Sequence, residues 1–212
     1  MISLRQLAVK GFKGLQNRCL EVASRGIDDE IARRDAERGH GALRWFTPEE
    51  APLVEALARI IVPSDEDTPG MDEVGVLDPM AIDTLDRLVA ASPDRQDLFS
   101  RGLLSFDIWA LDHYGRKFVE LPQEKQVELF RAAQRVYEGL NENVSSMGKA
   151  WRRLKIIREV RTGAFYAAQL YPRIRYDCFQ VFYTSRVSWT WLGYDGPPMD
   201  KGYASLSAPR EN

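Results

Sequence analysis

Apolar residues recur at steps of three and four along most of the chain, and this is the spacing of one face of an α-helix. The stretch FTPEEAPLVEALARIIVP (46–63) is the clearest case. Thr47 suits the N-cap, Pro48 suits the first helical position, and Glu50 completes a capping box. Pro63 follows the predicted end. The expected buried stripe consists of Leu53, Val54, Leu57, Ile60 and Ile61.

Helices are also predicted on both sides of this stretch. An N-terminal amphipathic helix is predicted from Leu4 to Val22, and further helices open at Asp78-Pro79 and at Ser92-Pro93. The later helices are expected over 121–137, 145–171 and 173–191. The sequence shows no convincing β-alternation and no βαβ rhythm. We therefore predict an all-α protein, an irregular helical bundle with an extended, aromatic and proline-rich C-terminal tail.

The length and the net charge of the chain limit the classes of partner that we expect it to bind. The chain has 212 residues and a formal net charge of -2, enough length for one sizeable core and no basic surplus that would favour nucleic acid or an anionic membrane. The basic cluster at 151–161 has the pattern of an ordinary amphipathic helix. The charged stretch IDDEIARRDAERGHGALR (27–44) has few apolar residues, so we expect either a mobile connection or a solvated helix there.

An acid-rich segment, PSDEDTPGMDEVGVLDP (63–79), separates two predicted helices. A calcium loop of the EF-hand type starting at Asp65 would place its glycine correctly at Gly70. Pro69, Met71 and Val76 would then occupy positions that need oxygen ligands. We therefore predict a structural connector, in which some acids favour the N-terminus of the following helix.

The sequence contains no constellation typical of catalysis. It has no glycine-rich phosphate loop, no serine nucleophile elbow, no C-x-x-C-H haem motif and no clustered metal ligands. His113 directly follows Asp112, but adjacent helical residues point in different directions. We therefore expect no catalytic, cofactor-binding or metal-binding residue in this chain. A small enzyme that uses His113 with Asp112 or Tyr114 remains a minor alternative.

Two cysteines and the first residues bear on the compartment. Cys19 and Cys178 are expected to be free thiols, or to form one long-range disulfide if the protein reaches an oxidising compartment. No run approaches the roughly 18 apolar residues of a membrane-spanning helix. The opening MISLRQLAVK is followed by no apolar region and no small-residue cleavage site, so it does not form a complete signal peptide.

Three stretches taken together resemble the gluconate 2-dehydrogenase subunit 3 family. The most specific is RIIVPSDEDTPGMDEVGV (59–76), and the next is LGYDGPP (192–198). The third is FSRGLLSFDIWALDHYGRKFVELPQEKQVELF (99–130). The resemblance covers about residues 45–203. It divides the chain into an N-terminal helix and charged connector (1–44), the family-like helical domain (45–203) and a tail (204–212).

The resemblance implies a non-catalytic small subunit. In this family a large glucose-methanol-choline-type flavoprotein carries FAD and the site for the sugar or sugar acid, and a multihaem cytochrome c often takes the electrons onward. The small subunit supports folding and assembly of the large one, and many members supply a twin-arginine export signal. Here only Arg5 remains of that signal. The chain is thus expected to act in the cytoplasm, or to leave it with a partner that carries the signal.

The stretch WTWLGYDGPPMDKGY (189–203) is the candidate interface with the large subunit. Aromatic side chains dominate the cores of protein interfaces, and its glycines and double proline argue against a helix. The expected interface residues are Trp189, Trp191, Tyr194, Pro197, Pro198 and Tyr203. Two alternatives remain open. The stretch could instead cap its own bundle, and the whole chain could be a free-standing helical adaptor or chaperone.

Overall fold

Helices account for the regular secondary structure of the described part of the chain. The computed structural model describes residues 25–38, 42–76, 78–141 and 163–195, apart from the side chain of Asn141. No strand occurs within these ranges, and the predicted all-α class is confirmed. After a helix over residues 25–37, the elements are α2 (Glu50–Ile61), η1 (Met71–Val76), α3 (Ala81–Ala90), α4 (Pro93–Tyr114), η2 (Phe118–Glu120), α5 (Gln123–Asn141), α7 (Ala164–Tyr183) and α8 (Arg186–Leu192).

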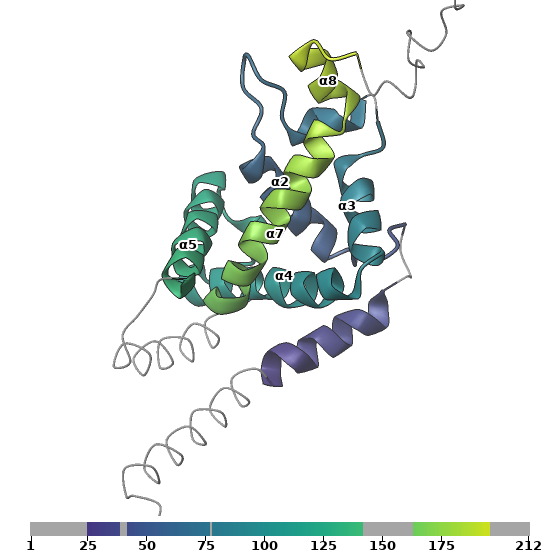
Figure 1. Ribbon diagram of the computed structural model, residues 1–212. Coiled ribbons are helices and arrows are strands. Elements are labelled where there is room, and N and C mark those ends of the chain that lie inside the picture. Colours follow the sequence, from purple (N-terminus) through teal and green to yellow (C-terminus); the bar gives the residue numbers. More distant parts are fainter. Residues whose placement is uncertain (1–24, 39–41, 77, 142–162, 196–212) are drawn as a thin grey trace, which may run out of the picture.

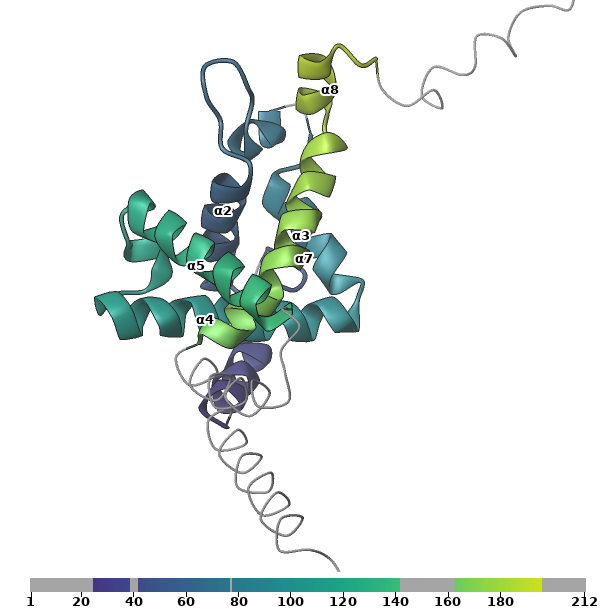
Figure 2. The ribbon, with the colours of Figure 1, turned by 60° about the vertical axis from the view of Figure 1, so that its left-hand side comes forward.

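Helix α7 is the central element. It packs most extensively against α4 and α5 and also contacts α2 and α3 (Figure 1). The helix over residues 25–37 lies beneath α4, whereas α8 lies at the opposite end of the molecule, as both views show (Figures 1 and 2). The core lies between these helices, and its largest fully buried side chains include Phe99, Phe106, Phe118, Leu57 and Ile174.

Two of the predicted helix starts carry the side-chain hydrogen bonds that the sequence suggested, although α2 begins at Glu50 and not at Pro48, and α3 begins at Ala81 and not at Pro79. Thr47 Oγ1 accepts a hydrogen bond from the Glu50 N–H at 3.2 Å, and the Thr47 N–H donates to Glu50 Oε2 at 3.1 Å. This is the predicted capping box. Ser92 caps α4 by accepting from the Arg95 N–H, and α4 ends at Gly115 in the left-handed conformation. These local signals were sufficient to place both helices.

Residues 27–37 of the charged stretch belong to a docked helix and not to a mobile connection. Ile27 and Arg34 are both buried. Arg34 pairs with Asp107 of α4, and Arg38 donates to Glu50 of α2 at 2.8 Å. Both carboxylates are buried, and a buried carboxylate needs a cation or several hydrogen-bond donors. Some charged residues of this stretch therefore pair with buried carboxylates of the core. The expectation of a solvated helix did not include these pairs.

Pro172 lies inside a helix, contrary to the predicted break near this residue. α7 runs without interruption from Ala164 to Tyr183 and buries side chains on both sides of the proline, including Leu170 and Ile174. A proline in a helix interior costs about 3 kcal/mol relative to alanine. Packing of α7 against α4 and α5 offsets this cost. The first part of the predicted 145–171 helix lies outside the described residues.

Several predictions fall on residues that are not described. The N-terminal helix from Leu4 to Val22 and the proline-rich tail from residue 196 onward lie there, and the domain boundaries at 44/45 and 203/204 stay predictions. Within the described ranges, no helix combines the length and the apolar character needed to cross a membrane.

Candidate partner interface

Helix α8 positions the first aromatic residues of the candidate interface. Ser185 Oγ accepts from the Ser188 N–H at 3.3 Å and so caps the start of the helix. At its end Gly193 adopts a φ of 67°, and the Tyr194 N–H donates to the Trp189 carbonyl at 2.8 Å. Residues 189–192 are helical, so the expectation that the stretch from Trp189 onward is not helical is wrong there, and the overlapping expectation of a helix that reaches residue 191 is correct. The single helix expected over 173–191 is, however, two helices, α7 and α8.

Two indole groups fasten α8 to the rest of the molecule. Trp189 Nε1 donates to the carbonyl of Tyr183, the last residue of α7, at 2.8 Å. Trp191 Nε1 donates to the Asp67 carbonyl in the 63–70 loop at 3.0 Å. The ring of Tyr194 packs edge-on against Trp189, with 5.9 Å between the centroids. These aromatic side chains are thus held in fixed positions, although they lie at the surface.

Asp78 of the acidic connector (63–79) accepts a hydrogen bond from the start of α8. Asp78 Oδ2 accepts from the Arg186 N–H at 2.6 Å, at the first residue of α8. The sequence predicted that acids of this segment would serve the following helix, but Asp78 serves α8, which is 108 residues away in sequence. Helix α3 begins at Ala81 and has no side-chain cap. Sequence distance hides such a cap, because capping rules consider only neighbouring residues.

Two other acids of the connector, Asp65 and Glu73, form hydrogen bonds within it. Asp65 Oδ1 accepts from the N–H groups of Asp67 and Thr68 at 3.0 and 2.8 Å, and hydrogen bonds from Thr68 and Asp67 lower the pKa of Asp65. Glu73 Oε2 accepts from the Gly70 N–H at 2.6 Å. A Cβ on Gly70 would collide with the backbone of Pro63 and Ser64. These contacts fix the path of a connector.

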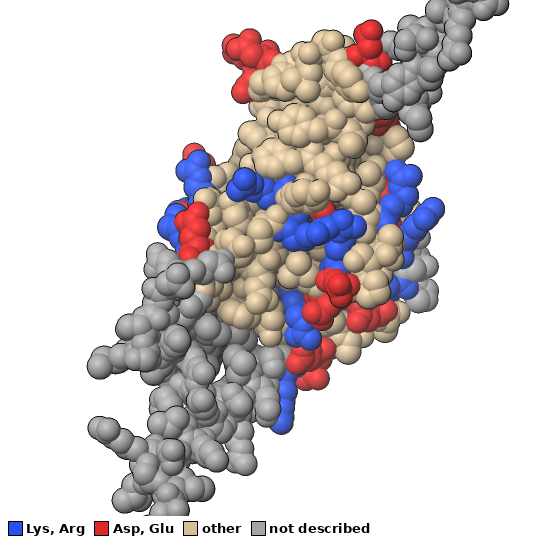
Figure 3. All heavy atoms as spheres, viewed as in Figure 1, with Lys and Arg blue, Asp and Glu red and all other residues tan. Residues whose placement is uncertain are grey.

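The α8 end of the molecule exposes large apolar side chains. Trp191 and Tyr194 are 44% and 49% exposed, and Leu192 is 56% exposed. The neighbouring η1 and the segment after it add two more exposed residues. We call this set the α8 apolar surface: Val76, Met80, Trp191, Leu192 and Tyr194. In Figure 3 this end carries few charges, and the acidic side chains lie at its edges.

The structure places only part of the predicted interface. Trp189 is half-buried, and Trp191 and Tyr194 are exposed at the α8 end. Pro197, Pro198 and Tyr203 lie outside the described residues. Sequence reasoning missed Val76, Met80 and Leu192. Leu192 adjoins Trp191 and could have been included, whereas Val76 and Met80 join the surface only through the fold.

The other residues of chemical interest have structural contacts. Cys178 is fully buried, and burial raises the pKa of its thiol. Cys19 lies outside the described residues, so the disulfide stays a prediction. His113 is exposed near the end of α4, with Nδ1 3.2 Å from the Trp109 carbonyl oxygen and 3.4 Å from Asp112 Oδ2. No group of three or more His, Cys, Asp or Glu side chains in the described ranges is placed to hold a metal ion.

The chain was compared with protein families, with curated proteins and with solved structures. No curated protein and no solved structure matched it. The family described as gluconate 2-dehydrogenase subunit 3 matches over residues 48–196, which include every labelled helix from α2 to α8. The matched region also contains the connector and the described residues of the α8 apolar surface. The chain belongs to the gluconate 2-dehydrogenase subunit 3 family and is by that membership an accessory subunit of a dehydrogenase complex.

Proposed function

We propose that this chain is the non-catalytic small subunit of a dehydrogenase that oxidises a sugar or sugar acid. Its partner is a large glucose-methanol-choline-type flavoprotein that holds FAD, and a cytochrome c carries the electrons onward. The small subunit supports folding and assembly of the large subunit and accompanies it during export. The α8 apolar surface forms part of the contact between them. The observation that carries this proposal is the exposure of rigidly held aromatic groups at one end of a family member.

Physical reasoning supports an interface at this end. Tryptophan and tyrosine are enriched among the residues that contribute most to protein binding, and rigid side chains lose little entropy when they bind. Trp191 is already oriented by its hydrogen bond to Asp67, and Tyr194 by its contact with Trp189. The net charge of -2 gives little electrostatic protection against aggregation of an exposed apolar surface. Cover by a partner would remove that hazard.

The contacts of His113 support the non-catalytic role. Its Nδ1 faces a backbone carbonyl of its own helix, and its ring packs edge-on against Trp109. Asp112 and His113 are about half exposed near the end of α4. A general base acts best in a cleft that excludes water and orients a substrate. We therefore assign catalysis and FAD to the large subunit.

Co-expression with the large flavoprotein subunit from the same organism tests the proposal. We compare Leu192→Asp with Leu111→Asp, because Leu111 is a similarly exposed leucine, 47% against 56%, at the end of α4. Leu192→Asp should leave the melting temperature of the free subunit unchanged and sharply lower the yield of active, flavin-loaded dehydrogenase. Leu111→Asp should affect neither quantity. Truncation after Leu192 should act like Leu192→Asp.

Three results would contradict the proposal. Flavin retained by the isolated small subunit would show that this chain binds the cofactor itself. Full yield of flavin-loaded dehydrogenase without the small subunit would remove the assembly role. A complex purified from the native host that contains no flavoprotein would favour the alternative of a free-standing adaptor.

A further inference from the structure

An open groove lies along the line where α5 and α7 pack together, on the face of the molecule that Figure 1 presents. Its volume is about 560 Å³, which lies in the usual range for binding clefts. The α5 wall contributes Gln134, Tyr137 and Glu138. We define the α5–α7 groove by these residues together with the ones that α7 contributes: Tyr171, Pro172, Arg175, Tyr176, Phe179, Gln180 and Tyr183.

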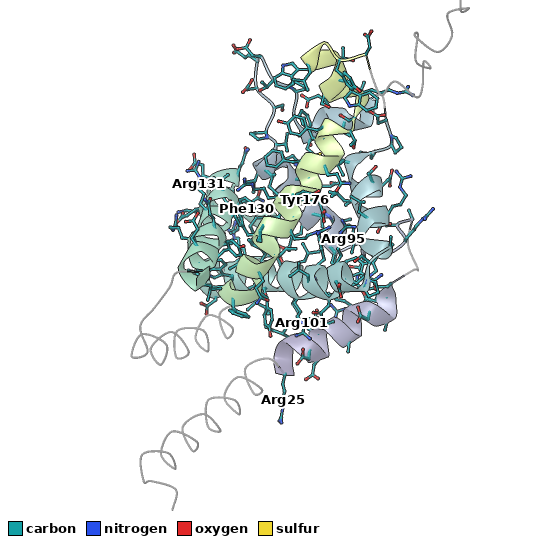
Figure 4. All side chains as sticks on the ribbon, in the orientation of Figure 1. Arg25, Arg95, Arg101, Phe130, Arg131 and Tyr176 are labelled. Atoms are coloured by element: carbon teal, nitrogen blue, oxygen red, sulfur yellow. The ribbon has the colours of Figure 1, made fainter. Side chains whose placement is uncertain are left out.

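Aromatic rings line the α7 side of the groove. Phe179 and Tyr183 stack with 6.1 Å between their centroids, and Tyr171 packs against Tyr137 across the floor at 6.1 Å. Tyr176 and Tyr183 are 61% and 52% exposed. Figure 4 shows Tyr176 on the outer face of α7. Aromatic rings exposed along a groove are the typical surface on which extended or proline-rich peptides dock.

Arg175 gives the groove a positive group in a defined position. Its Nη1 donates to the Tyr171 hydroxyl at 3.1 Å, and its guanidinium lies 5.8 Å from the ring centre of Phe179. Among the residues that the structure describes, no carboxylate pairs with Arg175. Glu138, on the facing wall, instead accepts from Gln134 at 2.9 Å. The remaining donors of Arg175 can bind a carboxylate with the bidentate geometry that guanidinium favours.

The dimensions of the groove suit an extended chain. Tyr171 and Tyr183 mark its ends, and twelve residues of α-helix rise about 18 Å. An extended peptide advances about 3.3 Å per residue, so five or six residues fill this length. The end at Tyr183 adjoins the α8 apolar surface through Trp189. The Tyr183 carbonyl accepts from Trp189 Nε1, and the Trp189 ring packs against Tyr194 of that surface. A segment in the groove would therefore continue the contact proposed for α8.

We propose that the α5–α7 groove binds an extended segment of the large dehydrogenase subunit, in which a carboxylate side chain lies between apolar or proline residues. The carboxylate pairs with Arg175, and the flanking side chains stack on Tyr176, Phe179 and Tyr183. The partner in this inference is the one named under the proposed function, so it rests on that proposal. It adds a second contact site, separate from the α8 apolar surface.

A charge-reversal pair tests the role of Arg175 in the purified complex. We compare Arg175→Glu with Arg131→Glu, since Arg131 is an exposed arginine of α5 that does not line the groove (Figure 4). Arg175→Glu should weaken binding of the large subunit by about tenfold or more, the usual effect of losing a charge-assisted hydrogen bond. Arg131→Glu should change it by less than about threefold. Equal effects of the two variants would overturn the inference.

Photo-crosslinking identifies the occupant without relying on the stability of a variant. The photoreactive residue p-benzoylphenylalanine replaces Gln180 at the groove, or Asp94 at the exposed start of α4 as a control. Position 180 should crosslink to one short segment of the large subunit that contains Asp or Glu. Crosslinks to residues 196–212 of the small subunit, to a second copy of it, or to nothing would overturn the inference. If the complex forms normally in those cases, the proposed function still stands; if no complex forms, both fail.

Discussion

Arg34 supplies a positive charge to the interior of the molecule. The residue is 4% exposed, and its Nη2 lies 3.4 Å from Asp107 Oδ2. Nη1 lies 3.9 Å from Glu50 Oε1. Burial raises the pKa of Asp107, although the Phe118 N–H and the charge of Arg34 act in the opposite direction. Arg34 thus balances two buried carboxylates on two different helices, and its loss would leave both without this cation.

Replacing this arginine by methionine tests the account at the residue scale. Arg34→Met should destabilise the protein by about 3–5 kcal/mol at pH 7, because breaking a buried pair leaves an uncompensated charge. Arg33→Met is the matched control. Arg33 is exposed, its ion pairs with Glu30, Glu37 and Glu49 are at the surface, and we expect little change in stability. Urea unfolding followed by circular dichroism measures both variants.

The pH dependence of the same variant identifies the responsible carboxylate. The pKa of Asp107 is raised in the folded protein, so its contribution to stability is present below its unfolded pKa and is lost as pH rises through its folded pKa. Removal of Arg34 raises that pKa further. The destabilisation by Arg34→Met should therefore be smallest in acid and grow toward neutral pH. A constant destabilisation from pH 4 to pH 8 would show that lost packing, and not the charge of Asp107, causes the effect.

The contact between α4 and α7 depends on two glycines. A Cβ on Gly102 of α4 would collide with the Leu170 side chain of α7. Gly163, directly before α7, has a φ of 81°, and a Cβ there would collide with the Ser105 carbonyl oxygen. The close approach of the two helices buries Leu103, Phe106 and Ile174 completely. This approach positions α7, which in turn carries the groove and leads to α8.

An alanine substitution tests this close approach at the scale of the element. Gly102→Ala should destabilise the protein by about 1–3 kcal/mol, because overpacking outweighs the better helix propensity of alanine. Gly26→Ala is the control, since Gly26 is also helical and a Cβ there would meet no atom. It should be neutral or stabilising by up to about 1 kcal/mol. If both variants stabilise the protein equally, α4 and α7 do not touch as described.

The sequence predicted helices well where their ends carry local signals. The Thr47–Glu50 capping box and the limits of α4 at Ser92 and Gly115 follow from neighbouring residues alone. Pro172 misled the prediction because its local cost is outweighed by tertiary packing of α7. The break at Thr184 and Ser185 contains neither proline nor glycine. It was therefore missed, although Ser185 is a favourable N-cap.

The candidate site was predictable in kind but not in extent. Aromatic residues in 189–194 pointed to an interface, and Trp191 and Tyr194 are exposed, while their contact with a partner stays a prediction. The groove was not predicted, because the sequence placed Tyr176, Phe179 and Tyr183 only within a helix expected over 173–191. α7 in fact has two apolar faces, of which Ile174 and Cys178 mark the buried one. Spacing alone cannot tell which of two faces meets the core.

At the scale of the whole molecule, the α8 apolar surface and the α5–α7 groove both lie away from the helix over residues 25–37. The helix over residues 25–37 closes the end beneath α4, and the α8 apolar surface forms the opposite end (Figures 1 and 2). The α5–α7 groove lies between these ends, where basic side chains also gather on the visible face (Figure 3). This arrangement leaves α8 and the outer face of α7 accessible, whereas the helix over residues 25–37 packs against the core.

Hydrogen–deuterium exchange of the chain, free and in complex with the proposed large flavoprotein subunit, tests most directly whether the α8 end contacts the partner. α8 lies at the surface of the free subunit, so the exchange of its amides should slow when the partner covers it. The account predicts the largest protection in α8 and the 63–70 loop, with no change in the helix over residues 25–37. Protection confined to that helix and the outer face of α4, with α8 unchanged, would contradict it.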